Sequence, residues 1–378
     1  MAGIYIHIPF CKQKCRYCDF VSFAGEYNFP SYIAALISEM RLFKDLMSGR
    51  TFNTVFIGGG TPSILPSVFI RTVLDETRKC FDIANDSEIT IEANPESLTL
   101  DKLYEYRDSG INRLSIGLQS VDDAVLRSIG RIHDRNTFIQ AFHNARKAGF
   151  NNINVDLMHG LPNQSCESYL ESIRLAAKLG AEHISSYSLI LEEHTPLFSD
   201  VTSGKTILPT EDETADMEDA GFILLKELGY SRYEISNFAK SGYECKHNLN
   251  YWDNGEYLGL GLNSHSALHF SERWVRWANE ANLSAYIVKS ANGTLPVETT
   301  ETISRTDEMF ETIMVGLRKI SGVNRHDFTE RFGIDPVENY APAVSEALLD
   351  GTMEVSDEYL RLTNRGLDFQ NEVLLKFM

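Results

Sequence analysis

Apolar and polar positions alternate along the first part of the chain in a way that predicts strands separated by helices. Runs of five to seven mostly apolar residues are rich in β-branched side chains, which is typical of buried strands. They occupy residues 4–8, 54–58, 88–93, 113–118, 152–157 and 183–189. The segments between them carry apolar and charged faces and predict helices at residues 30–48, 66–80, 99–108, 136–148, 166–179 and 211–228. Six βα units follow, and their periodicity fits an open parallel sheet or a barrel equally well.

The pattern changes after about residue 235. An aromatic, glycine-rich stretch at 251–270 comes before a region of mainly helical periodicity that starts near residue 302. The segment MEVSDEYLRLT, at 353–363, predicts a hairpin after several short helices. We therefore expect two domains, residues 1–235 and residues 236–378, the second being a smaller α+β domain that is partly winged-helix-like.

Charge and hydropathy narrow the class of protein. The 378 residues include 35 Lys plus Arg and 53 Asp plus Glu, a net charge of -18, which argues against nucleic acid as the main partner. No apolar run approaches the length of a transmembrane helix, and the first residues lack the pattern of a signal peptide. We expect a cytoplasmic protein, with peripheral membrane contact left open.

Three of the six cysteines crowd into the sequence CKQKCRYC at 11–18, directly after the first predicted strand. Three thiolates on one loop can bind three irons of a 4Fe4S cluster and leave the fourth iron for an amino acid chelate. Simple packing is the alternative, and a zinc site would need a fourth ligand nearby. We expect Cys80, Cys166 and Cys245, which are scattered, to be small buried apolar residues.

The CxxxCxxC spacing, with Tyr17 before its last cysteine, resembles the radical S-adenosylmethionine superfamily. That resemblance implies a partial, TIM-like (β/α)6 barrel, a 4Fe4S cluster on Cys11, Cys15 and Cys18, and S-adenosylmethionine bound beside it with Tyr17 against the adenine. The sequence IGGGTPS follows the second predicted strand. By the same resemblance its turn binds the methionyl amino group, through the residues Gly58, Gly59, Gly60 and Thr61.

Further segments are similar to the narrower family of oxygen-independent coproporphyrinogen dehydrogenases and their relatives. They are YIHIPFC at 5–11, IEANPES at 91–97, RLSIGLQS at 113–120 and INVDLMHGLP at 153–162. The similarity implies contacts to S-adenosylmethionine from Tyr5, Glu92, Gln119, Arg131 and Asp156. The alternatives are core packing for Tyr5, an exposed charge for Arg131, and helix capping or an ordinary ion pair for the two carboxylates.

The chain departs from the dehydrogenases at two points. Their cluster motif continues to a fourth cysteine where this chain has Phe20, and only ten residues precede Cys11. The segment CKHNLNYW at 245–252 instead resembles the HNxxYW signature of the HemW-type haem chaperones. This resemblance implies that His247 binds haem b with Tyr251 and Trp252 flanking it. His265 and His269 are alternative ligands, and hydrogen-bonded packing is the alternative for His247.

The expected function is therefore binding of haem as cargo and its delivery to acceptor haemoproteins, with an electron donor for the cluster. The alternative is an enzyme, an oxygen-independent coproporphyrinogen III dehydrogenase that performs radical oxidative decarboxylation in porphyrin biosynthesis. Radical chemistry on haem itself is a third hypothesis. Cleavage of S-adenosylmethionine in turnover and a homodimer both stay open.

Overall fold

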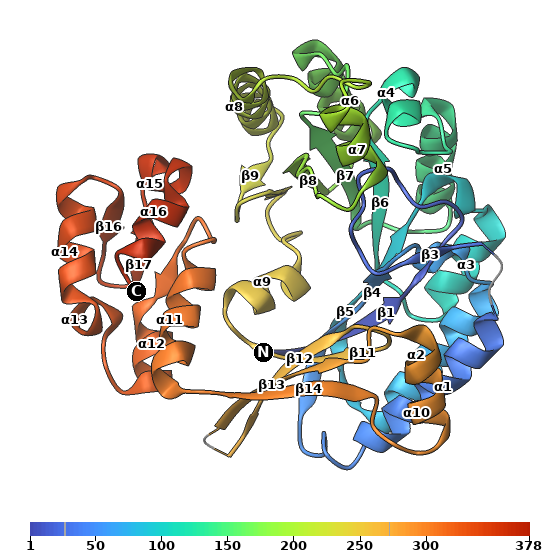
Figure 1. Ribbon diagram of the computed structural model, residues 1–378, viewed down its shortest axis with the longest axis horizontal. Coiled ribbons are helices and arrows are strands. Elements are labelled where there is room, and N and C mark those ends of the chain that lie inside the picture. Colours follow the sequence, from blue (N-terminus) through green and yellow to red (C-terminus); the bar gives the residue numbers. More distant parts are fainter. Residues whose placement is uncertain (26–27, 272) are drawn as a thin grey trace.

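A curved, twelve-stranded sheet forms the centre of the molecule in the computed structural model, which describes residues 1–25, 28–271 and 273–378 (Figure 1). Six neighbouring strands are parallel to one another. They are β1 (Ala2–Ile8), β4 (Thr51–Gly59), β5 (Asp82–Ala93), β6 (Arg113–Gln119), β7 (Ile153–His159) and β8 (His183–Ser188). All six predicted strands are thus present, in the order in which they occur along the chain.

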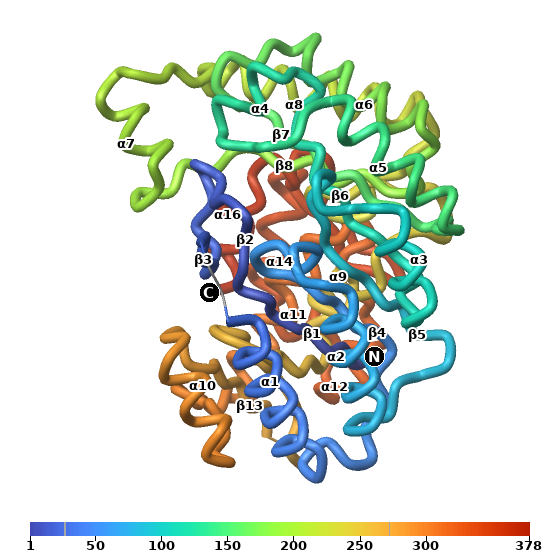
Figure 2. The backbone as a smooth tube through the Cα atoms, turned by 90° about the vertical axis from the view of Figure 1, so that its right-hand side faces the viewer, coloured from blue at the N-terminus to red at the C-terminus, as the bar shows by residue number. Residues whose placement is uncertain are grey.

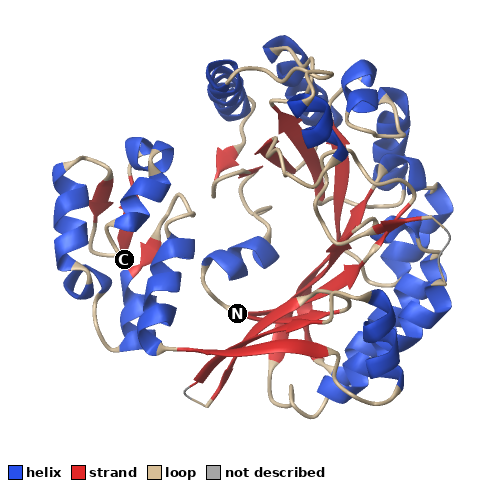
Figure 3. Cartoon of the chain, in the orientation of Figure 1, coloured by secondary structure: helices blue, strands red, loops and turns tan. Residues whose placement is uncertain are grey.

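Helices cover the outer face of these strands (Figure 3). Each predicted helix is present: α1 (Phe29–Phe43), α2 (Ser67–Cys80), α3 (Leu100–Asp108), α5 (Arg135–Lys147), α6 (Cys166–Leu179) and α8 (Glu211–Glu227). The short helices α4 (Asp123–Ser128) and α7 (Pro196–Thr202) were not predicted. A (β/α)6 arrangement that curves without closing is a partial barrel. The prediction of a partial barrel is therefore confirmed, and the alternative of an open doubly wound sheet is not.

Local sequence explains where several of these helices begin and end. The side chains of Thr99, Asp134 and Ser165 each accept a hydrogen bond from a backbone N–H of the first turn that follows them. Thr210 and Glu213 form a reciprocal capping box at the start of α8. The predicted end of the first helix at residue 48 was wrong, because α1 stops at Phe43 and the chain continues in turns up to residue 49.

The sheet continues beyond the parallel strands on both sides. Beside β1 lies β11 (Glu256–Leu260), again parallel, and beside β8 lie the antiparallel strands β10 (Asn237–Ala239) and β9 (Ser231–Arg232). An antiparallel extension follows from β11, formed by β12 (His265–Phe270), β13 (Arg273–Asn279) and β14 (Val297–Ile303). The aromatic, glycine-rich stretch therefore contributes strands to the main sheet.

Shorter elements complete this part of the chain. A two-stranded ribbon of β2 (Phe10–Cys11) and β3 (Phe23–Ala24) brackets the cysteine loop. Single turns of 3-10 helix follow β4 and β5, at Pro62–Ile64 and Pro95–Ser97. Helix α9 (Lys246–Trp252) precedes β11, and α10 (Leu283–Ala291) packs beside α1 (Figure 2). Within the described residues, no helix is long and apolar enough to cross a membrane.

The remaining chain, residues 304–378, has its own hydrophobic core, and we call it the C-terminal module. Its helices are α11 (Arg305–Gly316), α12 (Arg325–Phe332), α13 (Pro336–Asn339), α14 (Ala341–Leu349), α15 (Asn364–Asp368) and α16 (Gln370–Leu375). Its small sheet has the order β15-β17-β16, from β15 (Val323–Asn324), β16 (Met353–Val355) and β17 (Tyr359–Leu362). The predicted hairpin is present, while the domain boundary at residue 235 stays a prediction.

Candidate functional site

The first of two adjoining cavities lies at the carboxyl ends of the parallel strands, whereas the second extends toward their amino ends, where Arg113 of β6 and Asn154 of β7 line it. We call the first, about 590 Å³, the cysteine cavity, because Cys11, Cys15 and Cys18 line it. The second, about 470 Å³, is the histidine cavity, which is lined by His247 and His265 among others. Six residues line both cavities, namely Phe20, Gly59, Glu92, Ser115, Asp156 and Tyr187. The two spaces are therefore neighbours, with two carboxylates and two aromatic rings between them.

The cysteine loop brings three thiols to the first cavity. Cys11 is buried at the end of β2, whereas Cys15 and Cys18 are half-buried. The Thr61 hydroxyl donates to the Cys11 Sγ at 3.5 Å, and the Arg131 Nη1 donates to the Cys15 Sγ at 3.6 Å. Burial raises the pKa of the Cys18 thiol. No disulfide forms among the described residues, which include every cysteine, so the residue types suit an iron-sulfur cluster. As placed, however, the described His, Cys, Asp and Glu side chains form no group of three that could hold a metal, so the three thiols would have to come closer together to bind one.

The glycine-rich turn after β4 packs closely against the segment that leads to Cys11. Gly59 has a φ of 111°, and a Cβ there would lie 2.5 Å from the His7 ring. A Cβ on Gly60 would lie 2.8 Å from the backbone oxygen of Phe10. The Thr61 N–H also donates to that oxygen, at 2.7 Å. The glycines are therefore required by packing within the protein, in addition to any close approach of a ligand.

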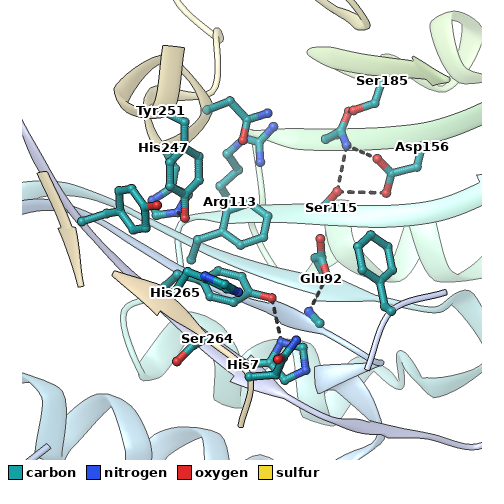
Figure 4. Close-up of a pocket in the computed structure, with 18 of the residues that line it drawn as sticks. His7, Glu92, Arg113, Ser115, Asp156, Ser185, His247, Tyr251, Ser264 and His265 are labelled. Carbon is teal, nitrogen blue, oxygen red and sulfur yellow. Dashed lines mark hydrogen bonds between the residues drawn. The ribbon is translucent and has the colours of Figure 1, made fainter. Parts of the chain in front are cut away.

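Two carboxylates, Glu92 and Asp156, line both cavities, and Figure 4 shows them among the residues of the histidine cavity. The Asp156 carboxylate accepts hydrogen bonds from the Ser115 hydroxyl at 3.0 Å and the Asn154 amide at 2.7 Å. The Glu92 carboxylate accepts from the Gly59 N–H at 3.1 Å. Burial, and then the charge of Asp156, raise the pKa of Glu92 to about 8. A cationic or hydroxyl-bearing ligand would therefore be favoured between these two groups.

Arg131 is not an exposed surface charge. Its Nη2 donates to the Asn94 Oδ1 and to the Gly117 backbone oxygen, both at 2.8 Å. These bonds hold the guanidinium against the cysteine cavity, where it can pair with a ligand carboxylate. Gln119 lines the same cavity at the end of β6 and has a φ of 66°, which is rare for a residue with a side chain. Tyr17 also lines the cavity, and burial raises its pKa.

Tyr5 lies apart from this group. It lines the histidine cavity and not the cysteine cavity, and its hydroxyl forms a 3.0 Å hydrogen bond with the Nδ1 of His7. The other ring nitrogen of His7 is 2.9 Å from the backbone oxygen of Val21, in the segment after the cysteines. Tyr5 is therefore connected to the cysteine loop through His7, and its predicted contact with S-adenosylmethionine stays a prediction.

His247 lies near the start of α9 and is buried. Its Nδ1 forms a 2.7 Å hydrogen bond with the Thr54 hydroxyl, and its Nε2 a 3.2 Å hydrogen bond with the Tyr251 hydroxyl. The ring stacks on Phe56 with centroids 5.1 Å apart. Burial, and then the charge of Arg113, lower the pKa of His247 to about 3. The imidazole is therefore neutral at physiological pH, the form that binds metal, and its Nε2 can ligate only if Tyr251 moves away.

The other residues of the predicted haem site do not all line the histidine cavity. Tyr251 lines the histidine cavity and makes an edge contact with Tyr257, with ring centroids 4.8 Å apart. Trp252 is not among the lining residues of either cavity and lies under the Arg318 guanidinium of the C-terminal module, 5.6 Å from the ring centroid. The exposed His265 lines the histidine cavity. His269 lies outside both cavities and is 3.0 Å from the Glu308 carboxylate.

Two buried charged residues near His247 were missed by the sequence analysis. Glu88 accepts hydrogen bonds from the backbone N–H groups of Lys246 and His247, at 3.1 and 3.2 Å, and thereby caps α9. Arg113 is 2% exposed and lines the histidine cavity. A charged residue at the head of the apolar strand RLSIGL is the signal that could have indicated Arg113. Nothing local indicates the role of Glu88, because its partners lie more than 150 residues away.

Comparisons with known proteins agree with this geometry. The family model for the Radical SAM superfamily matches residues 5–176, and the model for the HemN C-terminal domain matches residues 303–369. "Heme chaperone HemW" of Escherichia coli is 37% identical, covering 100% of this chain and 98% of the relative. The protein of the same name from Bacillus subtilis is 36% identical, covering 100% and 99%. The chain belongs to the HemW family. Membership of this radical SAM family implies a 4Fe4S cluster and S-adenosylmethionine.

A solved structure shows that the fold of this HemW-family chain is shared more widely. Coproporphyrinogen III oxidase (HemN) from Escherichia coli, described as a radical SAM enzyme, superimposes with a TM-score of 0.85 at 23% identity. The match covers 100% of this chain and 89% of that protein. At this identity the likeness concerns the fold alone, and it supports the predicted order of a radical SAM barrel followed by a C-terminal domain.

Proposed function

We propose that this chain is a haem chaperone, which binds haem b as cargo and transfers it to acceptor haemoproteins. The observation that carries the proposal is the position of His247, from the HNxxYW motif, in a cavity that adjoins the cavity of the three cysteines. The relatives named "Heme chaperone HemW", which are 36% to 37% identical over the full length of the chain, support the proposal. The proposal includes a cytoplasmic location and the division into residues 1–235 and 236–378.

In this proposal the cysteine cavity holds the resident cofactors. Cys11, Cys15 and Cys18 bind a 4Fe4S cluster, which, when bound, supplies one electron from an external donor to S-adenosylmethionine. Arg131 donates a hydrogen bond to the Cys15 Sγ and pairs with the carboxylate of S-adenosylmethionine. The proposed remaining contacts come from Tyr5, Tyr17, Gly58, Gly59, Gly60, Thr61, Glu92, Gln119 and Asp156.

Haem occupies the histidine cavity in this proposal. His247 ligates the iron through Nε2 once its hydrogen bond with Tyr251 is broken, while the bond between Nδ1 and Thr54 keeps the ring oriented. Tyr251 flanks the porphyrin. The flanking role of Trp252 requires a movement of α9, because its ring lies against the C-terminal module. His265, which lines the same cavity, is the alternative ligand.

An anaerobic haem titration tests the proposal, with wild-type protein beside His247→Ala and His143→Ala, an exposed histidine on α5. We expect the wild type and His143→Ala to bind haem stoichiometrically. The haem affinity of His247→Ala is expected to be at least tenfold lower. Coproporphyrinogen turnover is assayed on the same samples. The shared fold makes the dehydrogenase the second candidate, and turnover without haem binding would establish it in place of the chaperone.

A further inference from the structure

Phe20 is an aromatic side chain that the folded chain leaves uncovered at the boundary between the two cavities. It lines both of them, yet it is 70% exposed. Burying a phenylalanine side chain stabilises a protein by about 1.5–3 kcal/mol, so an exposed ring at this place makes little contribution to the fold. Its position between two ligand cavities indicates a role in binding.

The backbone that carries this ring is fixed on both sides. The Phe20 carbonyl accepts hydrogen bonds from the Lys14 ammonium at 3.0 Å and the Ser22 hydroxyl at 3.3 Å. The next carbonyl, of Val21, is 2.9 Å from the His7 Nε2. Because hydrogen bonds fix its backbone, the exposed ring is preorganised for a ligand. Preorganisation reduces the conformational entropy that is lost on binding.

Other exposed apolar side chains line the same cavities. Tyr187, which is 39% exposed, lines both cavities, and Ile190, which is 71% exposed, lines the cysteine cavity. The polar groups Glu92, Ser115 and Asp156 line both cavities as well. A ligand with a broad, flat apolar face and a polar periphery fits this combination, because aromatic rings gain most from stacking on such a face.

We propose that Phe20 stacks on the macrocycle of the porphyrin bound in the histidine cavity, with Tyr187 beside it. The inference rests on the proposed function, since it takes haem as the ligand. It assigns to Phe20 a contact with the ring system, whereas His247 contacts the iron. The two residues therefore respond differently to the removal of iron from the ligand.

Paired titrations with haem and with metal-free protoporphyrin separate these contributions. Phe20→Ala is expected to weaken the binding of both ligands by about tenfold or more. Phe20→Tyr keeps the aromatic ring and is expected to bind both ligands as the wild type does. His247→Ala is expected to weaken haem alone, because metal-free porphyrin offers it no iron. Phe369→Ala removes a 48% exposed ring from the C-terminal module and serves as the matched control. Iron-sulfur absorbance is recorded for every variant.

Unchanged affinity of Phe20→Ala for both porphyrins would overturn the inference, while haem binding by the wild type would leave the proposed function in place. A loss of S-adenosylmethionine affinity without a loss of porphyrin affinity would also overturn it, because Phe20 would then contact the adenosyl group. Absence of haem binding in the wild type would end the proposed function itself. If Phe20→Ala fails to assemble the cluster, Phe20→Leu, which keeps an apolar side chain without a ring, takes its place with the same expectation.

Discussion

At the scale of single residues, the site contains a carboxyl group whose burial makes stability depend on pH. The pKa of Glu92 is raised to about 8 from an ordinary value of 4.5. Between these values the native protein holds the proton while the unfolded chain releases it, so this group's contribution to the unfolding free energy falls as pH rises. We expect the stability of Glu92→Gln relative to the wild type to rise by about 4 kcal/mol between pH 5 and pH 9, because a pKa difference of one corresponds to about 1.4 kcal/mol.

Urea unfolding without added S-adenosylmethionine, at half-unit steps between pH 5 and pH 9, measures this difference. Glu193→Gln changes an exposed carboxyl group next in the chain to Glu192, which lines the cysteine cavity, and serves as the control. A constant difference between Glu92→Gln and the wild type across the range would contradict the raised pKa.

The cysteines give a second prediction at this scale. Replacing Cys11, Cys15 or Cys18 by Ala leaves two thiolates at the loop, so each variant is expected to lose the iron-sulfur absorbance after anaerobic reconstitution. Cys166→Ala, which changes a half-buried cysteine on α6, is expected to keep it. An unaltered cluster in all three loop variants would rule out the assignment of ligands.

The sequence alone brings the right residue types to the site but not their immediate partners. The C-terminal ends of parallel strands meet at one edge, so Glu92 and Asp156 were expected near the cysteines, and they line the same cavity. The separation of Tyr5 from the cysteine cavity and of Trp252 from the histidine cavity could not be predicted, because side-chain direction depends on packing between distant segments. Trp252 faces the C-terminal module for this reason.

At the scale of elements, α9 depends on one buried carboxylate. Glu88 on β5 accepts hydrogen bonds from the N–H groups of Lys246 and His247 and from the Cys245 thiol. Glu88→Ala leaves these donors without an acceptor, and we expect it to lower the unfolding free energy by about 1–3 kcal/mol in urea. Asp86→Ala, at an exposed position of the same strand, should change it by less than about 0.5 kcal/mol. Equal effects of the two substitutions would show that the cap contributes nothing.

Elements differ in how clearly the sequence indicates them. The six parallel strands are buried along most of their length and contain β-branched, mostly apolar runs, which is why their positions were predicted. Strand β14, VETTETI, is exposed along most of its length and has no such run, so the antiparallel extension was missed. The hairpin of β16 and β17 was found because polar turn residues separate two short strands.

At the scale of the whole molecule, the C-terminal module holds the far end of the helix that carries His247. Ion pairs join Lys319 to Asp253 and Arg276 of β13 to Glu311 of α11. The Asn254 amide donates to the Thr312 hydroxyl at 3.0 Å. Helix α9 therefore lies between the barrel, which contacts His247, and the module, which contacts the residues that follow Tyr251. Loosening the module should increase the motion of α9.

Arg331 of α12 offers the sharpest test of this coupling. Its guanidinium pairs with Glu308, donates to the Asn254 backbone oxygen at 2.8 Å, and lies 5.1 Å from the centroid of the Trp274 ring. Arg331→Ala removes a contact of the module with the end of α9 and another with the main sheet, so we expect faster hydrogen exchange at the amides of α9, by about tenfold. Arg361→Ala breaks an exposed ion pair with Glu354 inside the module and should leave α9 unchanged. Exchange in α9 that is the same in both variants would mean that the barrel alone positions His247. Faster exchange confined to Arg331→Ala would make the module part of the structure that positions the proposed haem ligand, because α9 connects it to His247.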